Sequence, residues 1–478
     1  MRRLDQSFFA IGCALTALLC GCASKPSMET TGSVETTTQA EAPKVAKDAG
    51  ARDPGPPTAT PFSTKPRSAK DSSGIEAAVR KALKWHPSVT ETIERLNQQN
   101  QMVEQARAGY LPRVNWGVNS SYDNDVDGNG YRPTVNLSAS QMVYDFGKID
   151  NKVKVERAGV EGRKSQVLLQ VDELIRDTAL AVTEVRRNRA LGKIAQDQIR
   201  DTGAILELVR ARTEKGASTR SDQLQAESRV QAAQSKRLEI NAQARSWQSK
   251  LGNLTGSTGD AQSASVSGSV PEWLEEACTA APPDWSRIPA IMQADAERTA
   301  ATAQVDLSKA EGLPTLSLEA GVGTDLMEIG ESDPEYNIGL NVKGSLYNGG
   351  ETAARRQAAD LALRASAAAR ERVRVEIEGK LLGAKGQIAS YRQLLASLTS
   401  RETMMKETRD LYRKQYLDLG TRTLLDLLNA DQEFHAARFD AVNIRYDLQK
   451  LNVECAFDTG RLRRYLSLEG EQLHGVRL

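Results

Sequence analysis

The sequence predicts an α+β fold built twice from one unit of helix, strand, strand, long helix and returning helix. Three observations support this prediction. Short motifs recur in the same order in both halves at a nearly constant offset, proline is missing from two long stretches, and alternating apolar and polar residues precede each of those stretches. The paired motifs are His86-Pro87 with Ile288-Pro289, Leu111-Pro112 with Leu313-Pro314, Tyr144-Asp145-Phe146-Gly147 with Tyr347-Asn348-Gly349-Gly350, and Gly216 with Gly420.

The first residues, 1–21, are predicted to be a signal peptide of the lipoprotein type. Arg2 and Arg3 precede an apolar run from Phe8 to Leu19 that is too short to span a membrane as a helix. Leu19-Cys20-Gly21-Cys22 resembles a bacterial lipobox, in which cleavage leaves a lipid-bearing cysteine, here Cys22. The alternative is an ordinary signal peptide with incidental cysteines.

The rest of the chain divides by composition and by the repeat. Ser, Thr, Pro, Ala and Lys dominate residues 22–73, which cannot bury enough apolar surface to fold and are predicted to be a disordered tether. We expect a first repeat over 74–251, a linker or equatorial segment over 252–284, a second repeat over 285–467 and a C-terminal tail over 468–478. If Cys22 is acylated, Cys278 and Cys455 are the cysteines left to pair, and the sequence leaves open whether they do.

Long helices are expected where proline is missing, which is from Pro133 to Pro271 and after Pro334. Apolar residues spaced by three or four predict a helix from Lys148 to Thr213, about 100 Å long. Its counterpart and the two returning helices are predicted at Glu351 to Tyr416, Ser221 to Leu251 and Thr423 to Leu466. Aromatic residues make up 5% of the chain and charged residues 26%, which is typical of long amphipathic helices packed side by side.

Four short segments alternate strictly between apolar and polar residues. They lie around Val114–Asn119, Val135–Ser140, Leu316–Gly323 and Asn337–Lys343. The polar face, which includes Glu319 and Lys343, suits a transmembrane β-barrel with lipid outside and water inside, although a half-buried soluble sheet has the same period. Four strands cannot close a barrel, and eight give an interior filled by side chains. A water-filled pore therefore needs at least three copies of the chain, which give twelve strands.

Together these features resemble the TolC family of outer-membrane channel proteins, over roughly residues 75 to 467. The most specific motifs are Gly420-Thr421-Arg422-Thr423 with Asp426, Tyr144-Asp145-Phe146-Gly147 and Tyr347-Asn348-Gly349-Gly350. The resemblance implies a trimer whose helical barrel crosses the periplasm of a Gram-negative bacterium. It also implies docking on an inner-membrane ABC transporter or proton-driven pump through a periplasmic adaptor.

The resemblance also implies site residues at the two glycine tips. Gly216, Ala217, Ser218, Gly420, Thr421 and Thr423 would meet the adaptor. Asp222 and Arg422 match the link that holds the entrance closed, and Asp426 would form a cation-binding ring at the periplasmic aperture. Asn429 stands where the family's namesake has a second Asp, which would weaken that ring. The alternative is solvated charge near helix ends, where Asp is favoured in any case.

Neither an enzyme nor a cofactor site is expected. The three histidines are His86, His435 and His474; His86 precedes a proline at a helix start, and we find no second ligand at a useful spacing for His435. Asp123-Asn124-Asp125-Val126-Asp127-Gly128 matches half of a calcium loop, but Thr134 stands where the bidentate Glu belongs, so we expect a polar hairpin loop and no metal. A net charge of +1 implies no nucleic-acid partner.

We therefore expect an outer-membrane export duct, with type I protein secretion as the first interpretation because Tyr144-Asp145-Phe146-Gly147 resembles the secretion branch of the family. Multidrug or metal efflux is the alternative, because lipoproteins are common among efflux relatives. A non-channel lipoprotein with a coiled-coil scaffold role is the alternative of another class.

Overall fold

The computed structural model describes residues 74–122, 131–257, 270–279, 282–326, 334–473 and 475–477. The predicted signal peptide, Cys22, the tether, the acidic loop from Asp123 to Gly128 and His474 lie outside these residues. The described residues all belong to one compact unit, which spans Pro66–Leu478.

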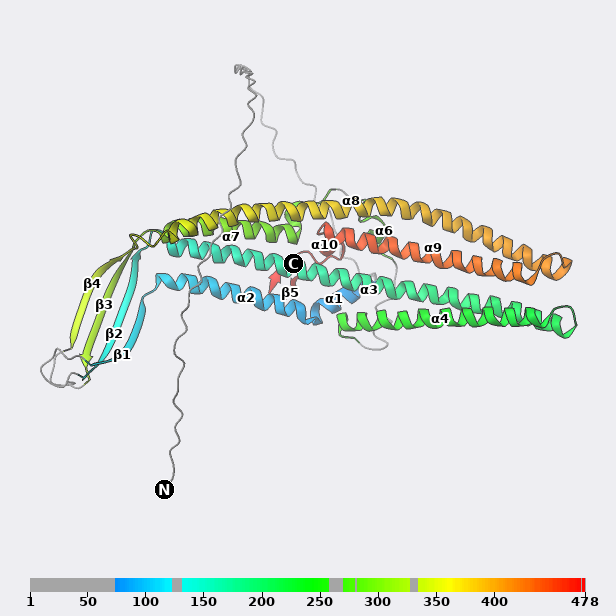
Figure 1. Cartoon of the computed structure of the whole chain (residues 1–478), viewed down its shortest axis with the longest axis horizontal. Helices are drawn as coiled ribbons and strands as arrows, with labels where there is room; N and C mark the ends of the chain where they lie inside the picture. The colour runs from blue at the N-terminus through cyan, green and yellow to red at the C-terminus, as the bar shows by residue number, and fades with distance from the viewer. Residues whose placement is uncertain are drawn as a thin grey trace, which may run out of the picture. The chain divides into compact units, whose positions relative to one another are not determined.

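The predicted duplication is confirmed (Figure 1). The first half contains α1 (Gly74–Trp85), α2 (Pro87–Arg107), η1 (Ala108–Tyr110), β1 (Arg113–Tyr122), β2 (Tyr131–Tyr144), α3 (Lys148–Glu214) and α4 (Arg220–Thr255). The second half contains η2 (Trp285–Arg287), α7 (Pro289–Glu311), β3 (Thr315–Asp325), β4 (Glu335–Lys343), α8 (Glu351–Lys414), η3 (Gln415–Leu419) and α9 (Leu424–Asp458). Between and after them lie α6 (Trp273–Glu276), α10 (Leu462–Tyr465), β5 (Gln472–Leu473) and β6 (Val476–Arg477).

The two long helices start at matching glycines. Gly147 precedes α3 with φ 84° and Gly350 precedes α8 with φ 89°, in the left-handed region that a glycine enters without a Cβ clash. Asp145 caps α3, because its Oδ1 accepts from the Gly147 amide at 2.9 Å and its Oδ2 from the Ile149 amide at 2.7 Å. The conspicuous Tyr144-Asp145-Phe146-Gly147 motif is thus a helix start.

The predicted returning helix of the second half was too long. We expected it to continue to Leu466, but α9 ends at Asp458 and a short α10 follows. Gly460 takes φ 67°, and the Arg461 amide donates to the Ala456 carbonyl at 2.9 Å, which closes the helix end. The apolar spacing continues past this break, so periodicity alone could not show it.

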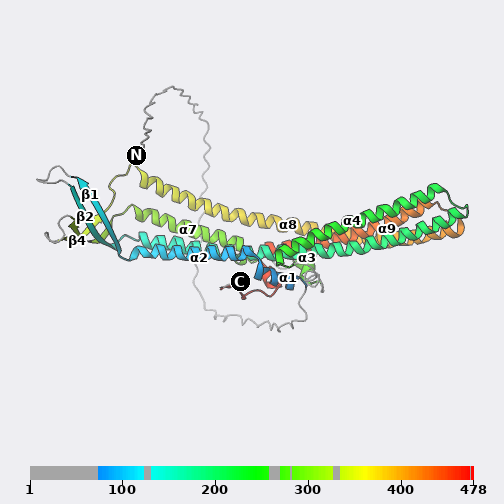
Figure 2. The same ribbon diagram turned by 90° about the horizontal axis from the view of Figure 1, so that it is seen from below.

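The four long strands form one antiparallel sheet in the order β1-β2-β3-β4, as the alternation predicted. The pairing of β2 with β3 joins the two repeats, with Leu137 opposite Trp116 on one side and Val322 on the other. The sheet lies at one end of α3 and α8, and the turns between α3 and α4 and between α8 and α9 lie at the other (Figures 1 and 2).

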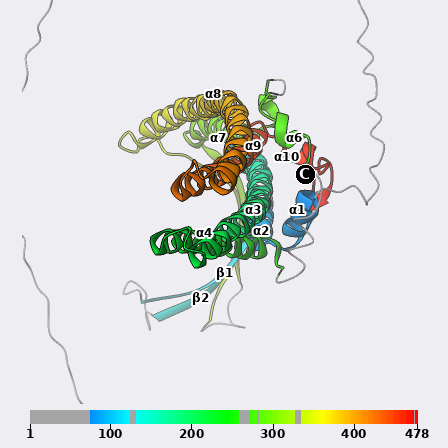
Figure 3. The same cartoon turned by 90° about the vertical axis from the view of Figure 1, so that its right-hand side faces the viewer.

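The helix α3 is the centre of the core. It packs against α1, α2, α4, α7 and α9, whereas α8 packs mainly against α7 and α9 (Figure 3). Accordingly α3 buries apolar residues along its length, and α8 leaves many exposed, including Leu361, Val375, Leu382, Leu394, Met404 and Leu411. No helix in the described part of the chain combines the length and the apolar character needed to cross a membrane.

The segment expected to be a linker is attached to the helices. Cys278 and Cys455 form a disulfide with a Cα–Cα distance of 5.2 Å, which answers the pairing question that the sequence left open. Leu274 is buried, and the ring of Trp273 stacks on that of Tyr465, with the centroids 5.5 Å apart.

The C-terminal region also packs on the first half. Leu468 is buried, and Glu471 accepts from Arg80 of α1 at 2.7 Å. In the core, Arg463 Nε lies 3.1 Å from Asp172 Oδ1. Burial nevertheless raises the pKa of Asp172 to about 7, because the loss of water outweighs the attraction of Arg463.

Candidate functional site

The first glycine tip joins α3 to α4. Gly216 takes φ 73°, and Thr219 then caps α4 by accepting from the Asp222 amide at 3.1 Å. The Asp222 carboxylate completes the capping box, since it accepts from the Thr219 amide at 3.0 Å and from the Ser218 hydroxyl at 2.9 Å. The Thr219 amide, more than the hydroxyl bonds, lowers the pKa of Asp222. Asp222 therefore fixes the start of α4.

The second tip repeats this geometry. After a π-helical turn at Gln415–Leu419, Gly420 takes φ 61° and Thr423 caps α9. The Asp426 carboxylate accepts from the Thr423 amide at 3.2 Å and from the Thr423 hydroxyl at 2.9 Å. The hydrogen bond from the amide in particular lowers the pKa of Asp426. The matched glycines Gly216 and Gly420 thus both lead into capping boxes, and the lowered pKa keeps Asp426 ionised at neutral pH.

The predicted link between Asp222 and Arg422 is not formed within the described chain. Arg422 donates to Gln415 Oε1 at 3.2 Å, and its guanidinium carbon lies 4.5 Å from the ring centroid of Tyr412. Each of the two charged groups is held by its own hairpin. Their role in holding an entrance closed stays a prediction, as does the cation ring of Asp426.

Two arginines that the sequence analysis missed join the tips. Arg229 of α4 donates to Asn429 Oδ1 at 3.1 Å and also to Gln432, both on α9. Arg212 of α3 lies 4.8 Å from the ring centroid of Tyr416 and donates to its carbonyl at 3.4 Å. Asn429, predicted only as a gap in an acidic ring, is thus one partner of a contact between the two halves. This contact left no signal in the sequence, because its two residues lie about two hundred positions apart.

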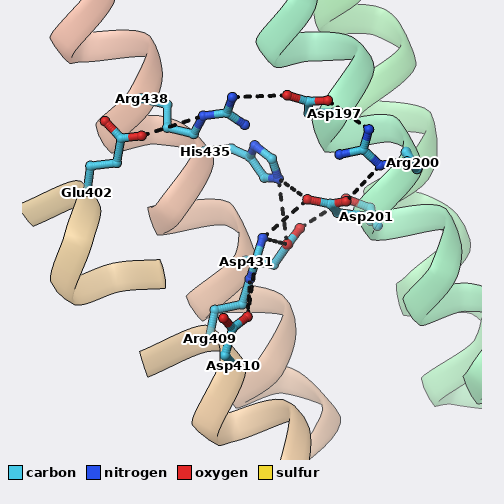
Figure 4. A network of polar contacts seen from close by, with 10 residues as sticks. Asp197, Arg200, Asp201, Glu402, Arg409, Asp410, Asp431, His435 and Arg438 are labelled. Atoms are coloured by element: carbon cyan, nitrogen blue, oxygen red, sulfur yellow. Dashed lines mark hydrogen bonds and ion pairs between the residues drawn. The ribbon is translucent and has the colours of Figure 1, made fainter. Parts of the chain in front are cut away.

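A second polar cluster joins the same helices farther from the tips (Figure 4). Its contacts between α3 and the second half are Arg409 to Asp201 at 3.2 Å, Arg438 to Asp197 at 3.0 Å and Thr202 to Asp431 at 3.1 Å. The Arg409 guanidinium also lies 4.3 Å from the ring centroid of Phe434. This cluster fixes α3 against α8 and α9.

His435 lies at the centre of this cluster, and the interpretation that it lacks a second ligand was wrong. Asp431 is one helical turn earlier on α9, and Asp201 approaches from α3. The spacing of four residues was visible in the sequence, but the approach of α3 was not. Burial above all lowers the pKa of His435 to about 4 and raises that of Asp431 to about 6. The imidazole is therefore neutral at pH 7.

The comparisons with known proteins agree with this architecture. The family model "Outer membrane efflux protein" matches residues 78–257 and 286–454. The outer membrane efflux protein BepC of Brucella suis biovar 1 is 23% identical over 409 residues, covering 82% of this chain and 86% of BepC. The pyoverdine export outer membrane protein OpmQ of Pseudomonas aeruginosa is 24% identical over 391 residues, covering 78% and 81%.

Solved structures show the same fold. A crystal structure of CusC superposes with a TM-score of 0.72 at 17% identity, covering 86% of this chain and 98% of that one. The family match extends over both repeats and more than half of the chain. The chain therefore belongs to the outer membrane efflux protein family, the family of TolC, and lies in the outer membrane of a Gram-negative bacterium with its helices extending into the periplasm.

Proposed function

We propose that three copies of this chain form a continuous export duct, with a twelve-stranded barrel in the outer membrane and a helical barrel below it. The observation that carries the proposal is the sheet. Its outer strands β1 and β4 each have one unpaired edge in the described chain. Unpaired edges of this length invite pairing with another strand, and closure of the sheet by neighbouring copies satisfies them.

The side chains on the sheet support closure in lipid. Trp116 on β1 is 79% exposed and Ile338 on β4 is 77% exposed. The other apolar side chains that alternate along these two strands are exposed as well. The opposite face is polar: Glu319 accepts from Asn341 at 2.9 Å and from Ser317 at 3.2 Å. An apolar face toward lipid and a polar face toward water is the pattern of a membrane barrel.

The helices support the same assembly. In a single chain the exposed apolar residues of α8 face water. Long helices of this kind are stable when they pack side by side with others. A second copy placed beside α8 would cover them. The two tips are proposed to meet a periplasmic adaptor, which connects the duct to an inner-membrane transporter. The residues proposed to touch the adaptor are Gly216, Ala217, Ser218, Gly420, Thr421 and Thr423.

The cargo proposed is a small molecule. BepC and OpmQ match most of this chain, and their names record efflux and pyoverdine export. The motif that favoured type I protein secretion has a local role, because Asp145 caps α3. It therefore does not separate the cargo classes, and protein secretion is the second candidate.

Assembly and conduction are tested on purified full-length protein in detergent. Native mass spectrometry should show three copies, and planar bilayers should show discrete current steps. A folded monomer would contradict the duct, and a trimer without current would support the scaffold alternative. Deletion of the gene separates the cargoes: efflux predicts sensitivity to dyes, drugs or metals, whereas type I secretion predicts loss of a protein from the medium.

A further inference from the structure

Two buried residues, Asp431 and His435, lie beside the half-buried Asp201 and carry polar atoms without a hydrogen-bond partner in the described chain. His435 is 0% exposed and Asp431 is 2% exposed. Within the described part of the chain, both imidazole nitrogens of His435 and Oδ1 of Asp431 lack a hydrogen-bond partner. Buried polar atoms of this kind are rare in folded proteins and call for a partner that the chain itself does not supply.

The distances between these donors match a metal coordination sphere. His435 Nε2 lies 3.4 Å from Asp201 Oδ2 and 3.7 Å from Asp431 Oδ1, and the three ligand atoms lie within 4.8 Å of one another. Two ligands of one tetrahedral ion with bonds of about 2.1 Å are about 3.4 Å apart. Only small side-chain movements would bring all three donors onto one ion.

The chemistry of the donors and the local charge point the same way. A neutral imidazole with two carboxylates is a nitrogen and oxygen set suited to Zn²⁺ and similar divalent metals. Among the groups in direct contact, five carboxylates (Asp197, Asp201, Glu402, Asp410 and Asp431) face three guanidinium groups (Arg200, Arg409 and Arg438). Arg413 also acts on Asp431 through its charge, so five carboxylates face four guanidinium groups. One negative charge is left over, which a divalent cation would offset.

We propose that Asp201, Asp431 and His435 bind one divalent metal ion of the Zn²⁺ class and that the ion ties α3 of the first repeat to α9 of the second. The site is separate from the glycine tips and does not depend on which cargo the duct exports. A bound ion would satisfy buried donors from both helices at once, and it would hold the two hairpins together.

Arg409 competes with the ion. Its Nη1 lies 3.2 Å from Asp201 Oδ2 and 3.8 Å from Asp431 Oδ1. It has other partners to keep, since it also pairs with Asp410 at 3.0 Å and lies over the ring of Phe434. Removing this cation should therefore tighten metal binding.

The test uses the full chain in detergent, without a histidine tag, after treatment with a chelator. Zn²⁺ bound per chain and its affinity are measured by dialysis and by competition with a chromophoric chelator. Wild type should bind one ion, His435→Gln and Asp431→Asn should weaken binding at least tenfold, and Arg409→Gln should strengthen it several-fold. Asp440→Asn, an exposed carboxylate on the same helix, is the matched control and should bind like wild type.

A second measurement does not rely on variants at the cluster. In a chain with His86→Gln and His474→Gln, His435 is the last histidine, so X-ray absorption at the zinc edge should show one imidazole at about 2.0–2.1 Å with oxygen neighbours. A zinc shell without imidazole would overturn the proposal. So would a wild type that binds no Zn²⁺, or folded His435→Gln that binds it as well as wild type.

Discussion

If the glycine tips form the entrance of the proposed duct, the contact between Arg229 and Asn429 should help to hold that entrance closed, and the size of its effect can be worked out. Arg229→Ala removes the hydrogen bonds to Asn429 and Gln432 that join α4 to α9. The contact is exposed, so we expect a loss of about 1 kcal/mol per chain. If the three links of a trimer release together, about 3 kcal/mol is lost, and the resting open probability should rise roughly a hundred-fold.

Asn429→Asp should act in the opposite direction. A carboxylate in place of the amide, 3.1 Å from Arg229, converts the hydrogen bond into an ion pair and adds about 0.5 kcal/mol per chain. Three copies give about 1.5 kcal/mol, so the open probability should fall roughly tenfold. The double variant separates this ion pair from any effect of the new charge alone.

The assay is single-channel recording in planar bilayers of wild type, the two single variants and the double variant. In the Arg229→Ala background, Asn429→Asp should no longer reduce opening, because the partner is missing. The reasoning is refuted if Arg229→Ala conducts like wild type, or if Asn429→Asp closes the channel equally with and without Arg229. Either result would mean that the contact is incidental to the gate.

The remaining predictions concern the two charged tip residues, stability and the anchor. Asp222→Ala and Arg422→Ala should each raise resting conductance, and the double variant should add little to either. If both single variants conduct like wild type, Asp222 serves only to cap α4 and Arg422 only to pack on Tyr412. Replacing Cys278 and Cys455 by Ala should destabilise the chain by about 3–5 kcal/mol, because the disulfide closes a loop across a sequence separation of 177, and a melting temperature equal to that of oxidised wild type would contradict this. The pKa of Asp172 is about 7 in the folded chain against an ordinary value of 3.8, so the folded state binds this proton more tightly than the unfolded state. The contribution of Asp172 to the stability of the fold is therefore greatest below about pH 4 and is lost as the pH rises to about 7. The difference in melting temperature between wild type and Asp172→Asn should therefore fall over that pH range, by an amount equivalent to at most about 4 kcal/mol, and then level off. A difference that stays constant with pH would mean that the pKa of Asp172 is near its ordinary value. Labelling with a palmitate analogue should tag wild type and not Cys22→Ser, and equal labelling would exclude the proposed anchor.

The sequence by itself determined the long helices, the four long strands and their order. Proline exclusion located the long helices, strict alternation located the strands, and the paired motifs showed the duplication. These signals are local: a glycine that starts or ends a helix, or a threonine followed three residues later by Asp, acts on its own turn. The capping boxes at Thr219 and Thr423 are local in the same way, since each threonine bonds to the Asp three residues later.

Only the tertiary structure decided which distant side chains meet. Arg229 faces Asn429 and Asp201 approaches His435 because the two halves pack side by side. Cys278 pairs with Cys455 because the segment between the repeats packs on α9. No periodic pattern encodes these contacts, since each depends on the rotation of one helix against another. Burial is decided in the same way: Asp172 and His435 look like ordinary polar residues in their helices, and their shifted pKa values arise from neighbours far away in the chain.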